Sequence, residues 1–278
     1  HDRLLRWRGP DSLDTAQASL DLARVWRTQT RFEQAERLTR TTLARLQALA
    51  AGSSPALSLR LAEAHELLGT IAHEQGRYGV AETAHREALA QRLALEGERG
   101  SGAATARANL AQALLRQGEL ESRFGGREAA SAVYLRLAAE APQRPEAIEA
   151  LLELADLTLT QRGDPEGARR ALEQVLKVRP RGPSADRARL LLCEASLRQG
   201  DLDEAAGHLE YVAGQAHAAE ALFRQAEVDF FAGEYETARQ GLEEFAHQAS
   251  RDEQANDALD LLLLLEEHAD AGDALRAY

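Results

Sequence analysis

A short turn pattern recurs along the chain: a Gly, a Tyr or Leu two positions later, and an Ala three positions after that. Its six copies, some of them loose, begin at Thr30, Gly76, Gly118, Gly163, Gly200 and Gly233. In the copy that begins at Gly118, the Ala is delayed until Ala130. Repeats of this kind predict an array of similar structural units, which constrains the fold more than any single motif does.

Each position of the pattern has a mechanical role in a helical hairpin. The Gly ends the first helix, because Gly adopts the left-handed conformation at the least cost. The Tyr or Leu closes the open end of the hairpin, and the small Ala lets the second helix lie close to the first. Residues 63–72 and 82–89 flank one such turn and carry apolar residues at three- and four-residue steps, as amphipathic helices do. The pattern therefore predicts an all-α chain of paired helices.

These residues resemble the tetratricopeptide repeat family. The best match is the repeat at 62–95, in which the family's positions are held by Leu68, Gly69, Gly76, Tyr78, Ala81 and Ala88. Trp26 stands at the family's aromatic position in the first repeat, and Pro142 and Pro180 stand where the family ends a helix with proline. The resemblance covers residues 14–278. It implies a right-handed α-solenoid of about six helical hairpins plus a partial C-terminal repeat, which holds other macromolecules and is not an enzyme.

The spacing of the turns departs from the family's usual repeat of about 34 residues. Successive copies begin 46, 42, 45, 37 and 33 residues apart. The surplus lies in loops at 51–55 and 97–102 and in an insertion at 121–126, inside the third hairpin. The first half therefore resembles the longer-helix repeats of kinesin light chains and bacterial sensors. We expect two blocks, 1–145 with long loops and 146–278 with regular repeats, stacked continuously.

The charge of the chain is unevenly distributed. The net charge of −12 combines a net +4 over residues 1–60 with a net −14 over residues 184–278. An acidic body of this kind argues against duplex DNA or RNA as the main ligand, because neutralising phosphates requires clustered Lys and Arg. The longest uninterrupted apolar run, Leu261 to Leu265, is too short to span a membrane. The expected partner is therefore a protein or a peptide. A single Lys among 33 basic residues, with abundant Ala, suggests a bacterial genome.

No pattern in the sequence indicates catalysis, a metal site or a cofactor. His65 and His85 stand where the family usually has aromatic residues, so we expect packed, hydrogen-bonded imidazoles. Cys193 holds the small-residue position of its repeat, and we expect it to be buried and unreactive. The glycines at 97–102 lack the Lys-Ser/Thr of a phosphate loop and indicate a flexible connector.

Candidate partner-binding residues follow from the register of the first helices. Asn109 lies in Ala-Asn-Leu-Ala, which resembles a motif of light-chain-like repeats whose Asn faces the concave groove and hydrogen-bonds a ligand's backbone. The same register places further polar residues in that groove: Glu66, Thr70, His73, Gln112, Arg116, Glu194, Arg198, Arg224 and Glu227. Phe230 and Phe231 point about 100° apart on a helix, so we expect one of them to be exposed as a partner contact. The alternative for the groove is a solvated helix face without a ligand.

Three functions follow from this organisation. In the first, a non-catalytic scaffold binds a protein or peptide on its concave face. In the second, copies of the chain self-assemble head to tail through the solenoid ends, because the head is positive, the tail is negative and the leucines at 261–265 lack a partner helix. In the third, the chain is the sensor or docking segment of a larger bacterial regulator, since it opens without Met and ends abruptly.

Overall fold

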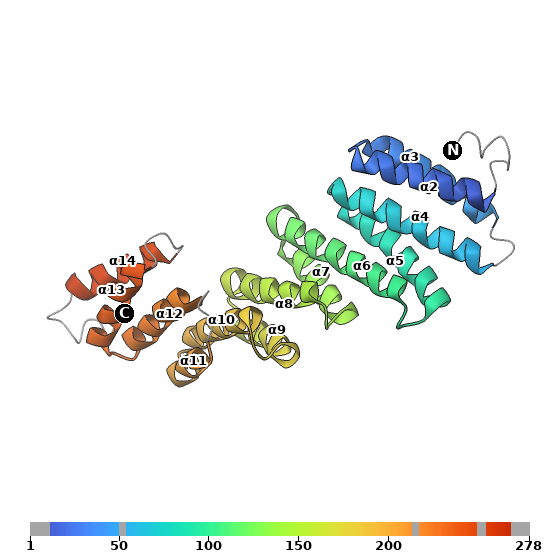
Figure 1. The fold of residues 1–278 in the computed structure, drawn as a ribbon. Coiled ribbons are helices and arrows are strands. Elements are labelled where there is room, and N and C mark those ends of the chain that lie inside the picture. Colours follow the sequence, from blue (N-terminus) through green and yellow to red (C-terminus); the bar gives the residue numbers. More distant parts are fainter. Residues whose placement is uncertain (1–11, 50–53, 213–216, 249–253, 268–278) are drawn as a thin grey trace. The chain divides into compact units, whose positions relative to one another are not determined.

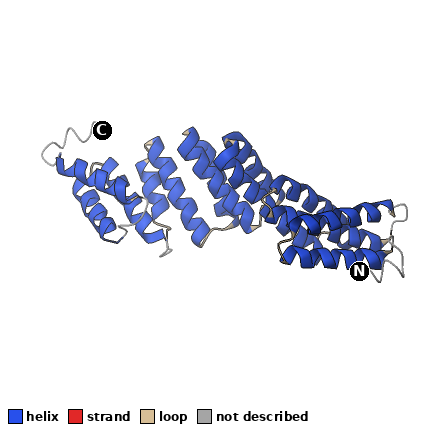
Figure 2. Cartoon of the chain, turned by 90° about the horizontal axis from the view of Figure 1, so that it is seen from above, coloured by secondary structure: helices blue, strands red, loops and turns tan. Residues whose placement is uncertain are grey.

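A computed structural model describes residues 12–49, 54–212, 217–248 and 254–267 of the chain. Throughout these ranges every regular element is a helix (Figures 1 and 2). The chain divides into two compact units, residues 1–147 and residues 148–278, called unit one and unit two below. The division falls inside helix α8, Pro145–Leu157.

In the part of unit one that the structure describes, the helices form three hairpins. Their helices are α2 (Leu13–Thr28) with α3 (Phe32–Ala48), α4 (Pro55–Glu74) with α5 (Tyr78–Glu96), and α6 (Ser101–Leu120) with α7 (Arg127–Glu140). A five-residue π-helical segment, η1 (Glu121–Gly125), joins α6 to α7. Each helix packs against its neighbours in sequence, and the first helices α2, α4 and α6 also contact one another in that order. The core is built from Leu and Ala, with Leu20, Leu46 and Ile71 almost completely buried.

Unit two continues the pattern. Its helices are α8, α9 (Pro165–Val178), α10 (Pro183–Gln199), α11 (Leu202–Leu209), α12 (Ala218–Phe231), α13 (Tyr235–Gln248) and α14 (Ala255–Glu267), with the π-helical segment η2 (Thr158–Arg162) after α8. Phe223 and Phe245 form a buried aromatic contact, with ring centroids 5.3 Å apart. Over the described residues the helices make six hairpins and one further helix, α14. The predicted all-α solenoid is therefore confirmed.

The predicted turns are confirmed at four glycines. Gly76, Gly163, Gly200 and Gly233 have φ values of 72°, 59°, 76° and 85°, and each lies between the two helices of a hairpin. In the first hairpin the same position is held by Thr30, with φ 60°. The Ala of the pattern is fully buried in all five of these hairpins, at Ala35, Ala81, Ala168, Ala205 and Ala238. The small side chain thus lets the paired helices approach closely.

The turn expected at Gly118 is wrong. Gly118 lies inside α6, and the chain turns at Gly126, with φ 115°, after the π-helical segment. A Cβ at position 118 would lie 2.3 Å from Cε1 of Tyr134, so this Gly makes room for a buried ring of α7. The insertion at 121–126 therefore prolongs the first helix of the hairpin and moves its turn to Gly126.

Proline positions agree with the prediction. Helix α7 ends two residues before Pro142, and α9 ends two residues before Pro180. Proline after a helix stops its continuation, because the ring removes an N–H donor and clashes with the preceding turn.

The leucines of α14 are better covered than the sequence suggested. Leu265 is buried, and Leu261, Leu262 and Leu264 pack against the core that α12 and α13 form. The preceding hairpin thus covers these four side chains, three of them in part, and the exposed leucines of α14 are Leu259 and Leu263. The second helix expected near the C-terminus lies outside the described residues. Among the described helices, none is both long enough and apolar enough to cross a membrane.

Candidate functional site

The first helices of the hairpins carry most of the predicted binding residues. We call the surface formed by α2, α4 and α6 the first-helix face of unit one, and that formed by α8, α10 and α12 the first-helix face of unit two. On α6, Asn109 is half-buried and Gln112 is exposed. Neither side chain hydrogen-bonds to another described residue. Arg116, one turn further on, donates to the carboxylate of Glu119 at 2.8 Å.

Two predicted residues of α4 lie near this part of α6. The ring of His73 packs edge-on against Tyr78, with centroids 5.3 Å apart. Its pKa is lowered by burial and, secondarily, by the positive charge of Arg116. His73 Nε2 is buried and has no hydrogen-bond partner among the described residues. The hydroxyl of Thr70 donates to the backbone oxygen of Glu66 at 2.8 Å.

Glu66 is bound to the second helix of its own hairpin. Its two carboxylate oxygens accept hydrogen bonds from Nε and Nη2 of Arg92, at 2.8 and 3.1 Å. Bidentate pairs of this kind hold both side chains in one geometry. Glu66 therefore ties α4 to α5, and its predicted contact with a partner stays a prediction.

In unit two the structure brings four predicted residues into one ion network. Glu194 of α10 accepts from Arg198 at 2.6 Å and, through its other oxygen, from Arg224 of α12 at 2.9 Å. Arg224 also donates to Glu227 at 2.7 Å. Burial raises the pKa of Glu227, although Arg224 opposes that change. These four side chains therefore bind one another and link α10 to α12.

A separate ion pair links α10 to α8 through residues that were not among the predicted ones. Arg187 of α10 donates to Glu153 of α8 at 2.9 Å. Asp156 is half-buried beside them, and its pKa is raised by burial and by the nearby Glu153 carboxylate. These residues occupy the same face of the first helices as the predicted ones, so the helical register could have identified them.

One of the two adjacent phenylalanines is exposed, as expected. Phe231 has 55% of its surface accessible, whereas Phe230 is 4% exposed and packs on Tyr235 with ring centroids 5.7 Å apart. The prediction that Phe230 contacts a partner is therefore wrong, because its ring is part of the core between α12 and α13. Phe231 stays the predicted contact.

Cys193 and His85 are both buried in the core. Cys193 is inaccessible, and burial raises the pKa of its thiol to about 12, so the sulfur stays protonated and unreactive at neutral pH. His85 is buried as expected, but its Nδ1 has no hydrogen-bond partner among the described residues, which corrects the expected hydrogen-bonded imidazole. Over the described residues no three His, Cys, Asp or Glu side chains are grouped to hold a metal ion.

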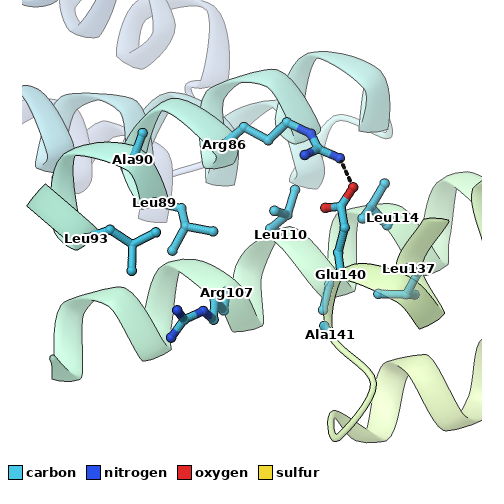
Figure 3. A pocket seen from close by; sticks show the side chains of 11 residues that line it. Arg86, Leu89, Ala90, Leu93, Arg107, Leu110, Leu114, Leu137, Glu140 and Ala141 are labelled. Carbon is cyan, nitrogen blue, oxygen red and sulfur yellow. Dashed lines mark hydrogen bonds and ion pairs between the residues drawn. The ribbon is translucent and has the colours of Figure 1, made fainter. Parts of the chain in front are cut away.

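A groove that the sequence analysis did not predict lies between α5, α6 and α7 of unit one (Figure 3). Its volume is about 440 Å³. The lining is formed by Arg86, Leu89, Ala90, Leu93, Arg107, Leu110, Ala111, Leu114, Leu137, Glu140 and Ala141. Eight of these eleven residues are Leu or Ala, so the floor and walls are apolar. Pockets of this size and character are typical of binding sites.

An ion pair lies at each end of this groove. At one end Arg86 of α5 donates to Glu140 of α7 at 2.5 Å, drawn as a dashed line in Figure 3. Arg86 also pairs with Glu82 of α5, which in turn accepts from Arg136 of α7 at 2.9 Å. Arg107 lies apart from these residues and pairs with Glu98 in the loop that precedes α6. The polar groups thus stand at the margins of an apolar surface.

The groove and the predicted residues of α6 lie on opposite faces of that helix. At about 100° per residue, Asn109, Gln112 and Arg116 point away from the row that begins at Arg107 and ends at Leu114. None of the predicted partner-binding residues lines the groove. Its leucines follow the ordinary helical period, and nothing in that period distinguishes a groove wall from a packed core.

Comparison with known proteins gives matches in unit two. Residues 157–216 and 220–251 each match a sequence model described as tetratricopeptide repeat. The first spans the turns at Gly163 and Gly200, and the second spans the turn at Gly233. No curated protein matches the sequence.

Three solved structures are similar to most of the chain. One is PilF of Pseudomonas aeruginosa, with 18% identity and a TM-score of 0.45 over 88% of this chain and 97% of that one. Another is a thermophilic TPR protein of Thermus thermophilus, with 19% identity and a TM-score of 0.46 over 76% and 100%. PilW, described as a widely conserved type IV pilus biogenesis factor, has 16% identity and a TM-score of 0.44 over 88% and 98%. At these identities and TM-scores the likeness carries no argument about function.

Proposed function

The chain belongs to the tetratricopeptide repeat family, and we propose that it is a non-catalytic scaffold that binds a segment of a protein partner on the first-helix face of unit one. Proteins of this fold generally serve as interaction scaffolds, which supports the coarse assignment. The choice of unit one over unit two comes from the hydrogen bonding of the side chains on each face.

The observation that carries the proposal is the state of Asn109. Its side-chain amide is half-buried and makes no hydrogen bond to another described residue, so a donor and an acceptor are available to a bound chain. Gln112, one turn away, is exposed and offers a second amide that makes no hydrogen bond to another described residue. An extended peptide has an unpaired N–H and C=O at every residue, which a row of amides on one helix face can satisfy.

Unit two offers fewer groups of this kind. Glu194, Arg198, Arg224 and Glu227 already bind one another. A partner that bound there would have to break charge-assisted hydrogen bonds, which are stronger than neutral ones. For this reason we place the peptide contact at α4 and α6.

Selection of a random peptide library on the immobilised chain tests the proposal. We expect the selected peptides to bind the wild-type chain and to lose about tenfold in affinity on Asn109→Ala, which corresponds to one hydrogen bond. Asn256→Ala is the matched control, because Asn256 is the exposed Asn of α14 and its loss should leave the affinity unchanged.

Two results would count against the proposal. One is a library that yields no peptide above background on the wild-type chain. The other is a set of peptides whose affinity is the same for the wild type and for the Asn109→Ala, Gln112→Ala double variant. Light scattering of the free chain at low salt separates the scaffold from the self-assembling alternative, which requires particles that grow with protein concentration.

A further inference from the structure

We infer that the groove between α5, α6 and α7 is a second docking surface, and that it takes an amphipathic α-helix of a protein partner with a carboxylate at the edge of its apolar stripe. The inference concerns the opposite face of α6 from the one used in the proposed function. It depends on the shape of the groove, on its apolar lining and on the charges at its margins.

The spacing of the lining residues favours a helical occupant. On α5 the groove is lined at 86, 89, 90 and 93, and on α6 at 107, 110, 111 and 114. Both rows repeat the steps of three, one and three residues, so each helix presents ridges one turn apart. A third helix can place its own side chains, spaced three and four residues apart, between such ridges. An extended peptide, with side chains that alternate between two faces, does not match this period.

The lining also sets the character of the side chains that enter. Leu89 and Leu93 are half-buried and Ala90 is exposed, so these three offer apolar surface in the groove, whereas Leu110, Leu114 and Leu137 behind them are already buried. A volume of about 440 Å³ has room for several apolar side chains of an incoming helix. Their burial would be driven by the removal of apolar surface from water on both partners.

Charge at the margins favours an acidic partner. Arg86 is paired with two carboxylates, those of Glu82 and Glu140. Its positive charge is therefore already compensated and does not attract a partner's carboxylate. Arg107 donates to the backbone oxygen of Glu98 at 2.9 Å and also pairs with the Glu98 carboxylate, whose side chain is 79% exposed. Exposed ion pairs of this kind contribute little stability. A carboxylate on the partner helix can therefore replace that of Glu98 at Arg107. A lysine in the same place would meet a guanidinium.

The packing of α5 and α7 on α6 keeps the groove in one shape. Arg86–Glu140 and Arg136–Glu82 join the two helices at the end away from Arg107. A surface that is already formed loses less conformational entropy on binding than one that must be assembled. The groove is thus already formed for a helix that brings the carboxylate at the edge of its apolar stripe to Arg107.

Two synthetic helices of about 18 residues, or about five turns, test the inference in the full-length chain. Both carry Leu on one face; one has Glu and the other Lys at the edges of that face. Fluorescence anisotropy should show saturable binding of the Glu peptide and at least about tenfold weaker binding of the Lys peptide. Arg107→Gln should reduce this preference.

Filling the groove provides the decisive variant. Ala90 is exposed and lines the groove. The indole ring of the Ala90→Trp variant should therefore fill the groove and lower the affinity for the Glu peptide by about tenfold or more. Ala132→Trp is the matched control, since Ala132 is exposed on α7 outside the groove. Circular dichroism of both variants verifies that they remain helical.

Several outcomes would overturn the inference. The first is that neither peptide binds the wild-type chain. The second is that the Glu peptide binds the Ala90→Trp variant as tightly as the wild type, and the third is that the Lys peptide binds the wild type as tightly as the Glu peptide does. Binding of laurate without binding of either peptide would identify an acyl-chain site instead. Loss of peptide binding on Asn109→Ala would place the helix on the first-helix face, which would refute this inference and leave the proposed function standing.

Discussion

Tyr134 of α7 fills the space beside Gly118 of α6, so closely that a Cβ on this Gly would lie 2.3 Å from Cε1 of the ring. Tyr134 is 1% exposed, and packed neighbours surround its ring. In the third hairpin a Gly in the last turn of α6 thus lets the ring of α7 pack against the helix. Four other hairpins have their turn glycine at this place in the pattern.

Gly118→Ala is expected to destabilise the chain. The added methyl group meets a buried ring that cannot move freely, and overpacking of this kind costs about 1–3 kcal/mol. Gly79→Ala is the control, because Gly79 also lies in a helix but has no atom within 4 Å of its would-be Cβ. It should stabilise by about 0.5–1 kcal/mol, through the higher helix propensity of Ala. Thermal unfolding followed by circular dichroism measures both, and equal effects would contradict the packing argument.

Stability should fall as the pH is lowered through the range of His85. Burial, together with the nearby His73, lowers the pKa of His85 from 6.5 to about 4. The unfolded chain therefore binds a proton below pH 6.5 that the folded chain takes up only near pH 4. The contribution of His85 is fully present above 6.5 and is lost between 6.5 and 4. From about pH 7 to about pH 5 the loss is about 2 kcal/mol.

Denaturant unfolding at about pH 7 and about pH 5 verifies this dependence. His85→Phe places an aromatic ring in the same space without a titrating group, and should reduce the loss between the two pH values. His247→Phe changes an exposed imidazole of α13 and should leave the loss as it is in the wild type. A His85→Phe variant with the wild-type pH dependence would show that other groups are responsible.

Thr30→Gly is expected to stabilise the first hairpin. Thr30 has φ 60°, and a β-branched residue in the left-handed region is strained. Removing that strain should raise the free energy of unfolding by about 1 kcal/mol. Thr28→Gly, two residues earlier in the last turn of α2, should lower it, because Gly is a poorer helix former than Thr. Melting temperatures that fall for both variants would argue against strain at Thr30.

Arg224→Met is expected to destabilise unit two. The change removes the guanidinium between Glu194 and Glu227, and all three side chains are mostly buried. Glu194 keeps its pair with Arg198, whereas Glu227 loses the arginine with which it pairs. Uncompensated charge in such a place costs about 2 kcal/mol, reduced from the fully buried case by remaining contact with water. Arg239→Met removes a solvent-exposed arginine that pairs with Glu236 and Glu243, and should have no measurable effect. Similar losses in the two variants would contradict the role of burial.

The turn and packing residues within a hairpin could be predicted from the sequence. The positive φ of Gly76, Gly200 and Gly233 and the full burial of the Ala five residues after each Gly follow from rules that act over a few residues. The same is true of the exposure of Phe231 beside a buried Phe230, which the helical step of about 100° requires. These features could be predicted because neighbours in sequence impose them.

The sequence by itself determined that the chain forms stacked helical hairpins, since each hairpin needs only its own turn and stripe of apolar residues. Tertiary structure alone decided what Gly118 does, because a Gly serves equally as a turn residue or as space for a distant ring. It also decided that Glu194 binds Arg224, thirty residues away. The groove depends on the distance between α5 and α7, and the packing of both helices on α6 sets that distance. The periodicity of the sequence does not determine it, because it describes each helix by itself.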